Sequence, residues 1–397
     1  MKALGLALGV GLWFTFLALP LAGLKVDYLA GTWELRGANL LWIFGGTALA
    51  YGLGQLWRTR LSRPAIAGLW SSFGVEPSLT RWLAYRPLRY FLVALLMALP
   101  LVASSYQTGV LVTLMMYMVL GLGLNVVVGI AGLLDLGYVA FYALGAYGYG
   151  LGHQYWGLSF WWALPLAGLL AALAGVVLGV PVLRLKGDYL AIVTLGFGEI
   201  IRLVLENWGE VTNGPAGVSG IPKPGLPGIR LGYEGENHLL YYLIFLLLLL
   251  SIGVNHRLVR SRLGRAWVAL REDEIAAQAM GVNLTRTKLA AFAFGAFWAG
   301  MVGVFFAAKA SFVNPASFTF AESAVLVCIV VLGGRGSVLG VILASLLLVL
   351  LPESMRFLQE YRMLLFGAVM VFSMVFLPQG LVKNPRPWYL KPKPEEP

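Results

Sequence analysis

Long apolar blocks separated by short polar stretches follow one another along almost the whole chain. Blocks such as Leu4–Leu24, Phe160–Leu183 and Leu239–Val254 are long enough to cross the hydrocarbon core of a bilayer as a helix, which takes about 20 residues. The pattern predicts an all-α integral membrane protein, a polytopic helical bundle of about 10–12 transmembrane or re-entrant segments. The first block exceeds the apolar part of a signal peptide, about 7–15 residues, so we expect an uncleaved first helix.

The individual segments are predicted at 4–24, 38–57, 90–103, 110–128, 138–152, 160–183, 188–205, 239–255, 289–308, 321–333, 337–351 and 362–378. Two of them, 138–152 and 337–351, are short and interrupted by glycine. They follow Gly129–Asp135 and Gly333–Gly336. Paired short segments of this kind mark the substrate pathway in many transporters, but close packing of helices through small residues produces the same pattern. The sequence leaves both interpretations open.

Basic residues gather in two loops, Arg58–Arg89 and His256–Lys288. The stretch Glu206–Asn237 is instead rich in glycine and proline and holds more acids than bases. Because cytoplasmic loops carry an excess of lysine and arginine, we expect the two basic loops and the tail after Lys383 to be cytoplasmic. Glu206–Asn237 is then external, and alternation of the segments places both termini in the cytoplasm.

Composition agrees with a membrane protein. Hydrophobic residues make up 59% of the 397 residues and charged residues 12%, whereas a soluble domain carries roughly 25% charged residues. The formal net charge of +11 comes from loops between apolar blocks, which we interpret as membrane topology and not as nucleic-acid binding. Cys328, the only cysteine, lies in an apolar run, so the sequence excludes a disulfide framework and a thiolate metal site.

Motifs of catalysis and energy conversion are absent from the sequence. It contains no G-x-x-x-x-G-K-[ST] phosphate-binding loop, so the chain is not expected to bind ATP by itself. The three histidines, His153, His238 and His256, are far apart and form no H-E-x-x-H pattern. We therefore predict a transporter subunit without catalytic residues, metal site or cofactor.

The second basic loop contains one predicted short helix, Glu274–Met280. Asp273 suits the N-cap, Glu274 suits the positive end of a helix, and Gly281 suits the position after the C-cap. An isolated helix of about two turns is unstable in water, so it is expected to lie against a surface of this chain or of another. The small residues expected to form that surface are Ala276, Ala277 and Ala279. A solvated charged loop is the alternative.

Strongly polar residues inside or beside apolar segments are Asn125, Asp135, Asp188, Glu199 and Glu322. Intramembrane charge is costly and indicates function by default. Asp135 and Asp188 lie near predicted segment ends, where an interfacial position would satisfy them. Glu199 precedes Arg202 by three residues, the spacing of an ion pair on a helix. Asn125 and Glu322 have no partner nearby in sequence, so Asn125, Glu322 and Glu199 are the candidate pathway residues.

Several long motifs carry a resemblance to a known family. They are Gly121–Gly129, Leu183–Arg202, Thr212–Gly217, Leu263–Trp267, Arg271–Ala277, Ser317–Ser323 and Val331–Ser337. They resemble the LivM-type permease subunits of bacterial high-affinity branched-chain amino-acid ABC transporters, over residues 88–383. The N-terminal pair of segments is similar to the extension found in that subunit.

The resemblance implies a set of partners in the bacterial inner membrane. A periplasmic binding protein would deliver Leu, Ile or Val, and this chain and a homologous second permease would form the pathway among membrane lipids. Two ABC ATPase subunits would bind the cytoplasmic face. The resemblance divides the chain into an N-terminal extension, 1–89, a permease core, 90–382, with a coupling loop, 256–288, and a cytoplasmic tail, 383–397.

The same family carries a coupling motif, E-A-A-x-x-x-G, where this chain has its short predicted helix. Ala276, Ala277 and Gly281 keep the spacing, but Ile275 occupies the glutamate position and Glu274 lies one residue earlier. The residues that the resemblance assigns to ATPase coupling are Arg271, Glu272, Asp273, Glu274, Ala276, Ala277 and Gly281.

Three other functions compete with amino-acid import. A permease for urea or short-chain amides resembles the same family, and nothing in the apolar segments identifies a pocket for a branched side chain. A stand-alone secondary transporter or channel would transport without ATP, and it leaves the capped helix without a purpose. A membrane-embedded enzyme is disfavoured because paired catalytic groups are missing.

Overall fold

A computed structural model describes residues 96–100, 103–182, 185, 187–225, 232–354, 367 and 380–382, together with the backbone of 24–27 and 32–35. The chain divides into two compact units, 1–74 and 75–397. In the first unit, strands β1 (Leu24–Asp27) and β2 (Thr32–Leu35) form an antiparallel hairpin with Leu24 opposite Leu35. The predicted segments 38–57 and 362–378, most of 4–24 and 90–103, the loop 58–89 and the tail 383–397 fall outside the described residues.

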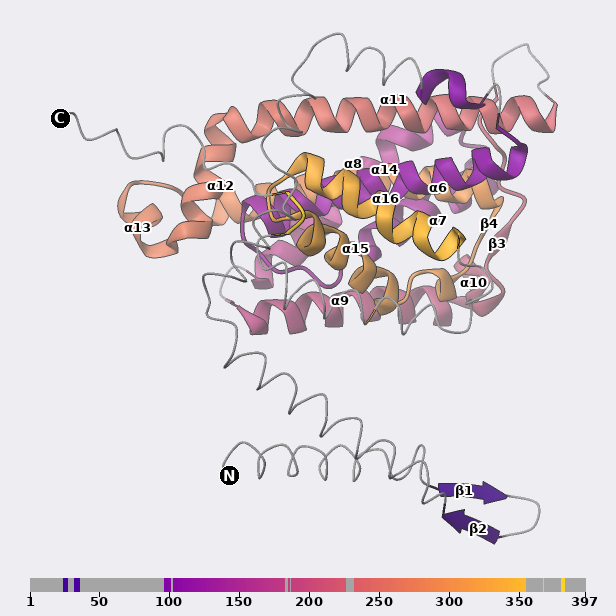
Figure 1. Ribbon diagram of the computed structural model, residues 1–397, viewed down its shortest axis with the longest axis horizontal. Helices are drawn as coiled ribbons and strands as arrows, with labels where there is room; N and C mark the ends of the chain where they lie inside the picture. Colours follow the sequence, from indigo (N-terminus) through magenta and orange to yellow (C-terminus); the bar gives the residue numbers. More distant parts are fainter. Residues whose placement is uncertain are drawn as a thin grey trace, which may run out of the picture. The chain divides into compact units, whose positions relative to one another are not determined.

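The second unit is a helical bundle (Figure 1). Its helices are α6 (Ser105–Leu124), the π-helix η2 (Asn125–Ile130), α7 (Val139–Trp156), α8 (Phe160–Val182), α9 (Asp188–Asn207), α10 (Gly209–Thr212), the 3-10 helix η3 (Gly214–Ala216), α11 (Tyr233–Arg260), α12 (Arg262–Glu272), α13 (Glu274–Ala279), α14 (Leu284–Ala310), the 3-10 helix η4 (Pro315–Ser317), α15 (Phe320–Gly333) and α16 (Val338–Ser354). Strands β3 (Val218–Ser219) and β4 (Phe312–Val313) pair antiparallel. The prediction of an all-α bundle is confirmed, and each segment predicted between 110 and 351 is a helix.

Five of the described helical stretches are long and apolar enough to cross a membrane: Ser105–Ile130, Phe160–Pro181, Glu234–Arg260, Leu284–Ala310 and Pro315–Gly333. A shorter apolar helix covers Val338–Leu350. Helices α7 and α9 are not in this group, and α9 carries the charged side chains Glu199, Arg202 and Glu206. The bundle therefore combines complete spans with shorter or more polar helices.

Helix α14 forms the centre of the bundle, where it packs against α6, α7 and α8 (Figure 1). Small residues allow this close approach. A Cβ added at Gly145 would lie 2.1 Å from the Gly300 carbonyl oxygen, and one at Gly303 would lie 2.4 Å from that of Tyr142. Such contacts are typical of helix pairs in membranes. Close packing therefore explains the glycines inside the predicted segment 138–152.

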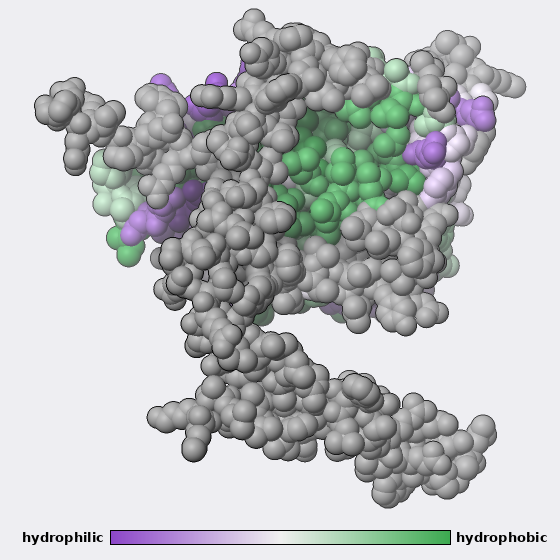
Figure 2. All heavy atoms as spheres, in the orientation of Figure 1, coloured by the Kyte–Doolittle hydropathy of each residue, from purple (hydrophilic) through white to green (hydrophobic). Residues whose placement is uncertain are grey.

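Hydrophobic and hydrophilic residues occupy different parts of the surface along the length of the bundle. Figure 2 shows hydrophobic residues over the middle of the visible face and hydrophilic residues toward its two ends. At one end, the one where Figure 1 places α12 and α13, hydrophilic and hydrophobic residues are mixed. An apolar band between polar ends is the arrangement that a bilayer requires.

Candidate functional site

The two glycine-rich motifs that precede the short predicted segments meet inside the bundle, where each breaks the run of helix. The first break is the loop 131–138, between η2 and α7, and the second is the turn between α15 and α16. Asn125 Oδ1 accepts a hydrogen bond from the Gly336 backbone N–H at 2.8 Å, with Asn125 fully buried. A Cβ at Gly129 would lie 2.5 Å from the Gly336 nitrogen, so only glycine fits there. We call this contact of Asn125, Gly129 and Gly336 the break junction.

Helix α7 begins deep in the bundle and not at its end. The Tyr138 hydroxyl donates to the Gly295 carbonyl at 2.9 Å. At 1.5 Å per residue, Gly295 lies about 16 Å along α14 from Leu284. The Val139 backbone N–H donates to Ser323 Oγ on α15 at 3.3 Å. The loop 131–138 therefore turns inside the bundle, and we call it the re-entrant loop.

The re-entrant loop holds a buried acid, Asp135. Its side chain is fully buried, although the sequence allowed an interfacial position. Oδ1 accepts from the Gly137 backbone N–H at 2.9 Å, whereas Oδ2 has no hydrogen-bond partner among the described residues. A buried carboxyl with one unpartnered oxygen is costly to hold in its charged form.

A small cleft of about 10 Å³, which is room for about one water molecule, lies beside the start of α7. It is bounded by the start of α7, the middle of α9 and the start of α15. Phe318 and Phe320 contribute apolar walls, while Glu199, Thr319 and Ser323 contribute polar groups. Glu199 is the charged side chain among the described residues that line it. The cleft thus offers an apolar wall, one carboxylate and the N-terminus of a helix in one place.

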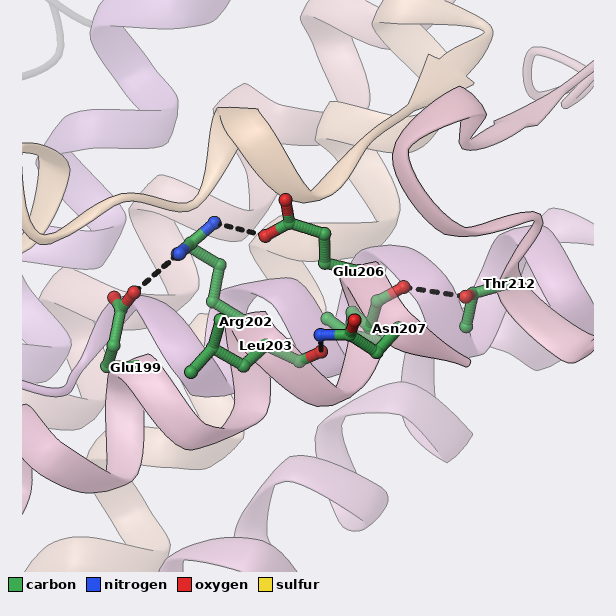
Figure 3. A network of polar contacts seen from close by, with 7 residues as sticks. Glu199, Arg202, Leu203, Glu206, Asn207 and Thr212 are labelled. Carbon is green, nitrogen blue, oxygen red and sulfur yellow. Dashed lines mark hydrogen bonds and ion pairs between the residues drawn. The ribbon is translucent and has the colours of Figure 1, made fainter. Parts of the chain in front are cut away.

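Glu199 belongs to an ion network along α9 (Figure 3). Arg202 contacts Glu199 at 2.5 Å and Glu206 at 2.6 Å. This confirms the predicted pair between Glu199 and Arg202 and adds a second acid one turn further on. The three side chains are 42%, 22% and 37% exposed in sequence order. The network carries one excess negative charge on the outer face of α9.

Glu322, the third candidate pathway residue, has a partner that the sequence did not reveal. The Tyr117 hydroxyl on α6 donates to Glu322 Oε2 at 2.6 Å. Glu322 precedes the cleft residue Ser323 on α15, whereas Asn125 lies at the break junction. The three predicted residues therefore do not form one cluster: Glu199 and Glu322 lie at or next to the cleft, and Asn125 lies apart from them.

The short helix predicted in the basic loop is confirmed as α13. Asp273 is its N-cap, and its carboxylate accepts from the backbone N–H groups of Ile275 at 2.8 Å and Ala276 at 2.9 Å. Gly281 has φ +85°, the left-handed conformation expected after a helix C-terminus. The sequence therefore predicted both ends of this helix, because short-range hydrogen bonds determine them.

Helix α13 lies against this chain through Ala277, one of the three alanines expected to form its contact surface. Ala277 is only 4% exposed, so the expected contact is made within this chain, and the role of these residues in ATPase coupling stays a prediction. Glu274 pairs with Lys288 of α14 at 2.5 Å, and Lys288 is 2% exposed. The outward surface includes Ala276 and Ala279 and carries two large apolar side chains, Ile275 at 74% and Met280 at 84% exposure.

Arg271, at the end of α12, also points into the chain. Its Nη1 donates to the Gly129 carbonyl at 2.8 Å, and its Nη2 contacts Glu272 at 3.0 Å. One turn earlier in α12, Trp267 Nε1 donates to the Thr287 carbonyl at 2.8 Å. Helices α12 and α13 are therefore attached to both α14 and η2. No motif in the sequence signals these contacts, which join residues far apart along the chain.

Comparisons with known proteins identify relatives. A family model described as the permease component of branched-chain amino acid transport systems matches residues 106–374. The high-affinity branched-chain amino acid transport system permease protein LivM of Escherichia coli K12 is 48% identical over 373 residues, 87% of this chain and 86% of that protein. The same-named protein of Salmonella typhimurium is 48% identical over 369 residues, with the same coverage.

A more distant relative covers less of the chain. The probable branched-chain amino acid transport permease protein LivM of Methanocaldococcus jannaschii is 24% identical over 237 residues, 55% of this chain and 67% of that protein. No solved structure matches the chain.

Proposed function

The chain belongs to the family of branched-chain amino acid transport system permease components, and from that premise we propose that it imports Leu, Ile or Val across the bacterial inner membrane. It is a multi-pass permease subunit and not an enzyme. The observation that carries the substrate class is the 48% identity to LivM over 373 residues. In the proposed complex, the chain pairs with a homologous second permease, two ABC ATPase subunits supply the energy, and a periplasmic protein delivers the amino acid.

The proposed pathway runs along the cleft between α7, α9 and α15. A branched-chain amino acid crosses as a zwitterion with an apolar side chain, so its path needs apolar walls and a few polar groups. Phe318 and Phe320 supply the former, and Glu199 supplies a carboxylate suited to the ammonium group. The exposed charges of α9 support this location, because charge facing lipid is costly, whereas charge beside an aqueous path or a second permease is not.

The proposed coupling element is α13. Its exposed Ile275 and Met280 form an apolar surface at the polar end of the bundle, which suits insertion into a groove of an ATPase subunit. Glu274 takes part indirectly, since its pair with Lys288 holds α13 against α14. ATP binding would draw the ATPases together and shift the permease pair between outward- and inward-facing states. In this proposal both termini and the loop 256–288 face the cytoplasm.

Co-purification followed by reconstitution tests this function. The chain is tagged and isolated from its native membrane, and mass spectrometry identifies its partners. We expect a second permease and ATPase subunits. In proteoliposomes, the complex with its binding protein should transport L-leucine only when ATP is present on the side of the membrane that carries the ATPase subunits. Uptake of urea or acetamide instead of leucine would overturn the substrate class, and leucine uptake without ATP would establish a secondary transporter.

A further inference from the structure

We propose that Arg271 is the positioning residue that passes movement of α12 and α13 to the break junction of Asn125, Gly129 and Gly336. The inference rests on the proposed function only in taking α13 as the part that the ATPases move. It assigns Arg271 a contact inside the permease, whereas the family resemblance places it among the residues of the ATPase contact. The argument follows a continuous path of contacts from α12 to the turn between α15 and α16.

The first step is the contact of Arg271 with the end of η2. Its guanidinium donates to the Gly129 carbonyl at 2.8 Å. Gly129 is in the last turn of η2, where helix carbonyls lack partners within the helix. A hydrogen bond from a charged donor is stronger than one between neutral groups. Arg271 therefore holds the end of this helix by a carbonyl that needs a donor.

The aliphatic part of the same side chain makes a second contact, with Gly132. A Cβ at Gly132 would lie 2.6 Å from Arg271 Cγ, and Gly132 has φ +76°. The Arg271 side chain thus lies directly on the backbone just after η2, and its guanidinium is bonded to the Gly129 carbonyl in the last turn of η2. When α12 moves toward η2 or away from it, the Arg271 side chain therefore pushes or pulls the backbone at the first helix break.

The last step leads from Gly129 to the second helix break. The side of Gly129 where a Cβ would point lies against the Gly336 nitrogen and the Asn125 carboxamide, at 2.5 Å and 2.1 Å from that Cβ position. Gly336 in turn donates to Asn125 Oδ1. A residue without a side chain, packed against backbone, leaves no soft group to absorb a displacement. Gly129 therefore connects Arg271 directly to the hydrogen bond that closes the junction.

The π-helical form of η2 suits such a movement. Single π-helical turns within α-helices are frequent at functional sites. Here the π-helix joins a complete apolar span to the re-entrant loop that leads to α7. A shift of η2 would change both the break junction and the position of the α7 N-terminus beside the cleft. This links the cytoplasmic helices to the proposed pathway.

A first test uses hydrogen exchange on the purified chain and needs no transport. Arg271→Ala should speed exchange of the Gly336 backbone N–H by about tenfold, the effect of losing one charge-assisted hydrogen bond, although Arg271 does not bond to Gly336. The matched control is Arg265→Ala, which removes an exposed arginine of the same helix bonded to the Arg260 carbonyl. Unchanged exchange at Gly336 in Arg271→Ala would overturn the proposed transmission.

A second test measures coupling in the reconstituted complex with L-leucine as probe. Arg271→Ala should keep its ATPase subunits and lower leucine imported per ATP hydrolysed by about tenfold, while Arg265→Ala matches the wild type. If Arg271→Ala instead loses its ATPase subunits, or imports leucine as the wild type does, the inference is wrong. A wild-type complex that imports no leucine would contradict the proposed function, and the hydrogen-exchange result would still decide the inference.

A glycine pair covers the case in which Arg271→Ala fails to fold. Gly132 and Gly220 both have φ +76°, but a Cβ meets Arg271 only at Gly132 and meets nothing within 4 Å at Gly220. Gly132→Ala should therefore speed exchange at Gly336 more than Gly220→Ala, which carries the same backbone strain. Equal behaviour of the two variants would contradict the inference.

Discussion

Helices α8 and α9 follow one another in the chain, but their exposed surfaces differ. Every residue of α8 is apolar or small, and its exposed side chains include Trp162 at 70%, Leu173 at 66% and Val177 at 68%. Helix α9 also exposes apolar residues, such as Ile200 at 59%, yet the same helix carries the Glu199–Arg202–Glu206 network. A surface without a polar group suits lipid tails, whereas a surface with three charges does not.

The comparison separates two environments on one bundle. Exposure alone would make both helices lipid-facing. The charges on α9 and the cleft beside it favour a second permease or an aqueous path on that side, whereas the apolar surface of α8 suits lipid. The comparison assumes that a charged group inside the bundle must be hydrated, paired or neutralised. The substitution with the largest expected effect on stability tests this assumption.

Asp135 tests that assumption inside the bundle. Its side chain is fully buried, and Oδ2 has no hydrogen-bond partner among the described residues. A buried charge without a partner costs about 3–5 kcal/mol, and an amide of the same shape avoids that cost. Asp135→Asn should therefore be more stable than the wild type at pH 8. Thermal unfolding in detergent at pH 8 measures the difference, and equal stability of the two proteins would contradict the assignment.

A lysine placed on each helix compares the two surfaces directly. Leu173→Lys on α8 should reduce stable insertion by about 3 kcal/mol, the cost of lysine at the centre of a lipid-facing helix. Ile200→Lys on α9 should cost less than about 1 kcal/mol, because its surroundings are polar or protein-covered. The amount of folded protein in the membrane and its unfolding in detergent give both values. Equal losses would show that α9 faces lipid as α8 does.

The difference between α8 and α9 is visible in the sequence because it depends on which residue types follow one another within each helix. Apolar blocks predicted the helices, three-residue spacing predicted the pair of Glu199 and Arg202, and capping residues predicted α13. All these features depend on residues that are close together in the sequence. The two short, glycine-interrupted segments were also recognised from the sequence, which left a transport pathway and close helix packing as alternatives, and the pathway stays a proposal.

Contacts between distant residues could not be predicted in the same way. Asn125 bonds to Gly336, Tyr117 bonds to Glu322, and Arg271 bonds to Gly129, each more than a hundred positions away along the chain. Which side of α13 faces inward depends on α14, so the sequence alone did not distinguish the buried Ala277 from the exposed Ala276 and Ala279. A single sequence carries no local signal for such pairs, because packing of whole helices decides them.

Removing Arg202 should disturb the proposed path on α9 without affecting α8. Arg202→Ala leaves Glu199 and Glu206 without their shared partner and changes the net charge of the network from one negative to two. Because all three side chains are partly exposed, solvent screening limits the effect on stability. We expect leucine uptake by the complex to fall about tenfold, with normal assembly. The control is Arg257→Ala, in the last turn of α11, and wild-type uptake by Arg202→Ala would remove α9 from the path.

The smallest expected effect separates the two acids of that network. Glu199 lines the cleft, whereas Glu206, one turn beyond Arg202, is not among the cleft residues. Each variant, Glu199→Gln or Glu206→Gln, removes one carboxylate charge and one partner of the same arginine, so their structural costs should match. Only Glu199→Gln should also weaken contact with the substrate ammonium group, and we expect its half-saturating leucine concentration to rise about threefold to tenfold above that of Glu206→Gln. ATP-driven uptake in proteoliposomes, measured against leucine concentration, decides between them. The same half-saturating concentration for both would mean that the network stabilises α9 and that the substrate passes elsewhere.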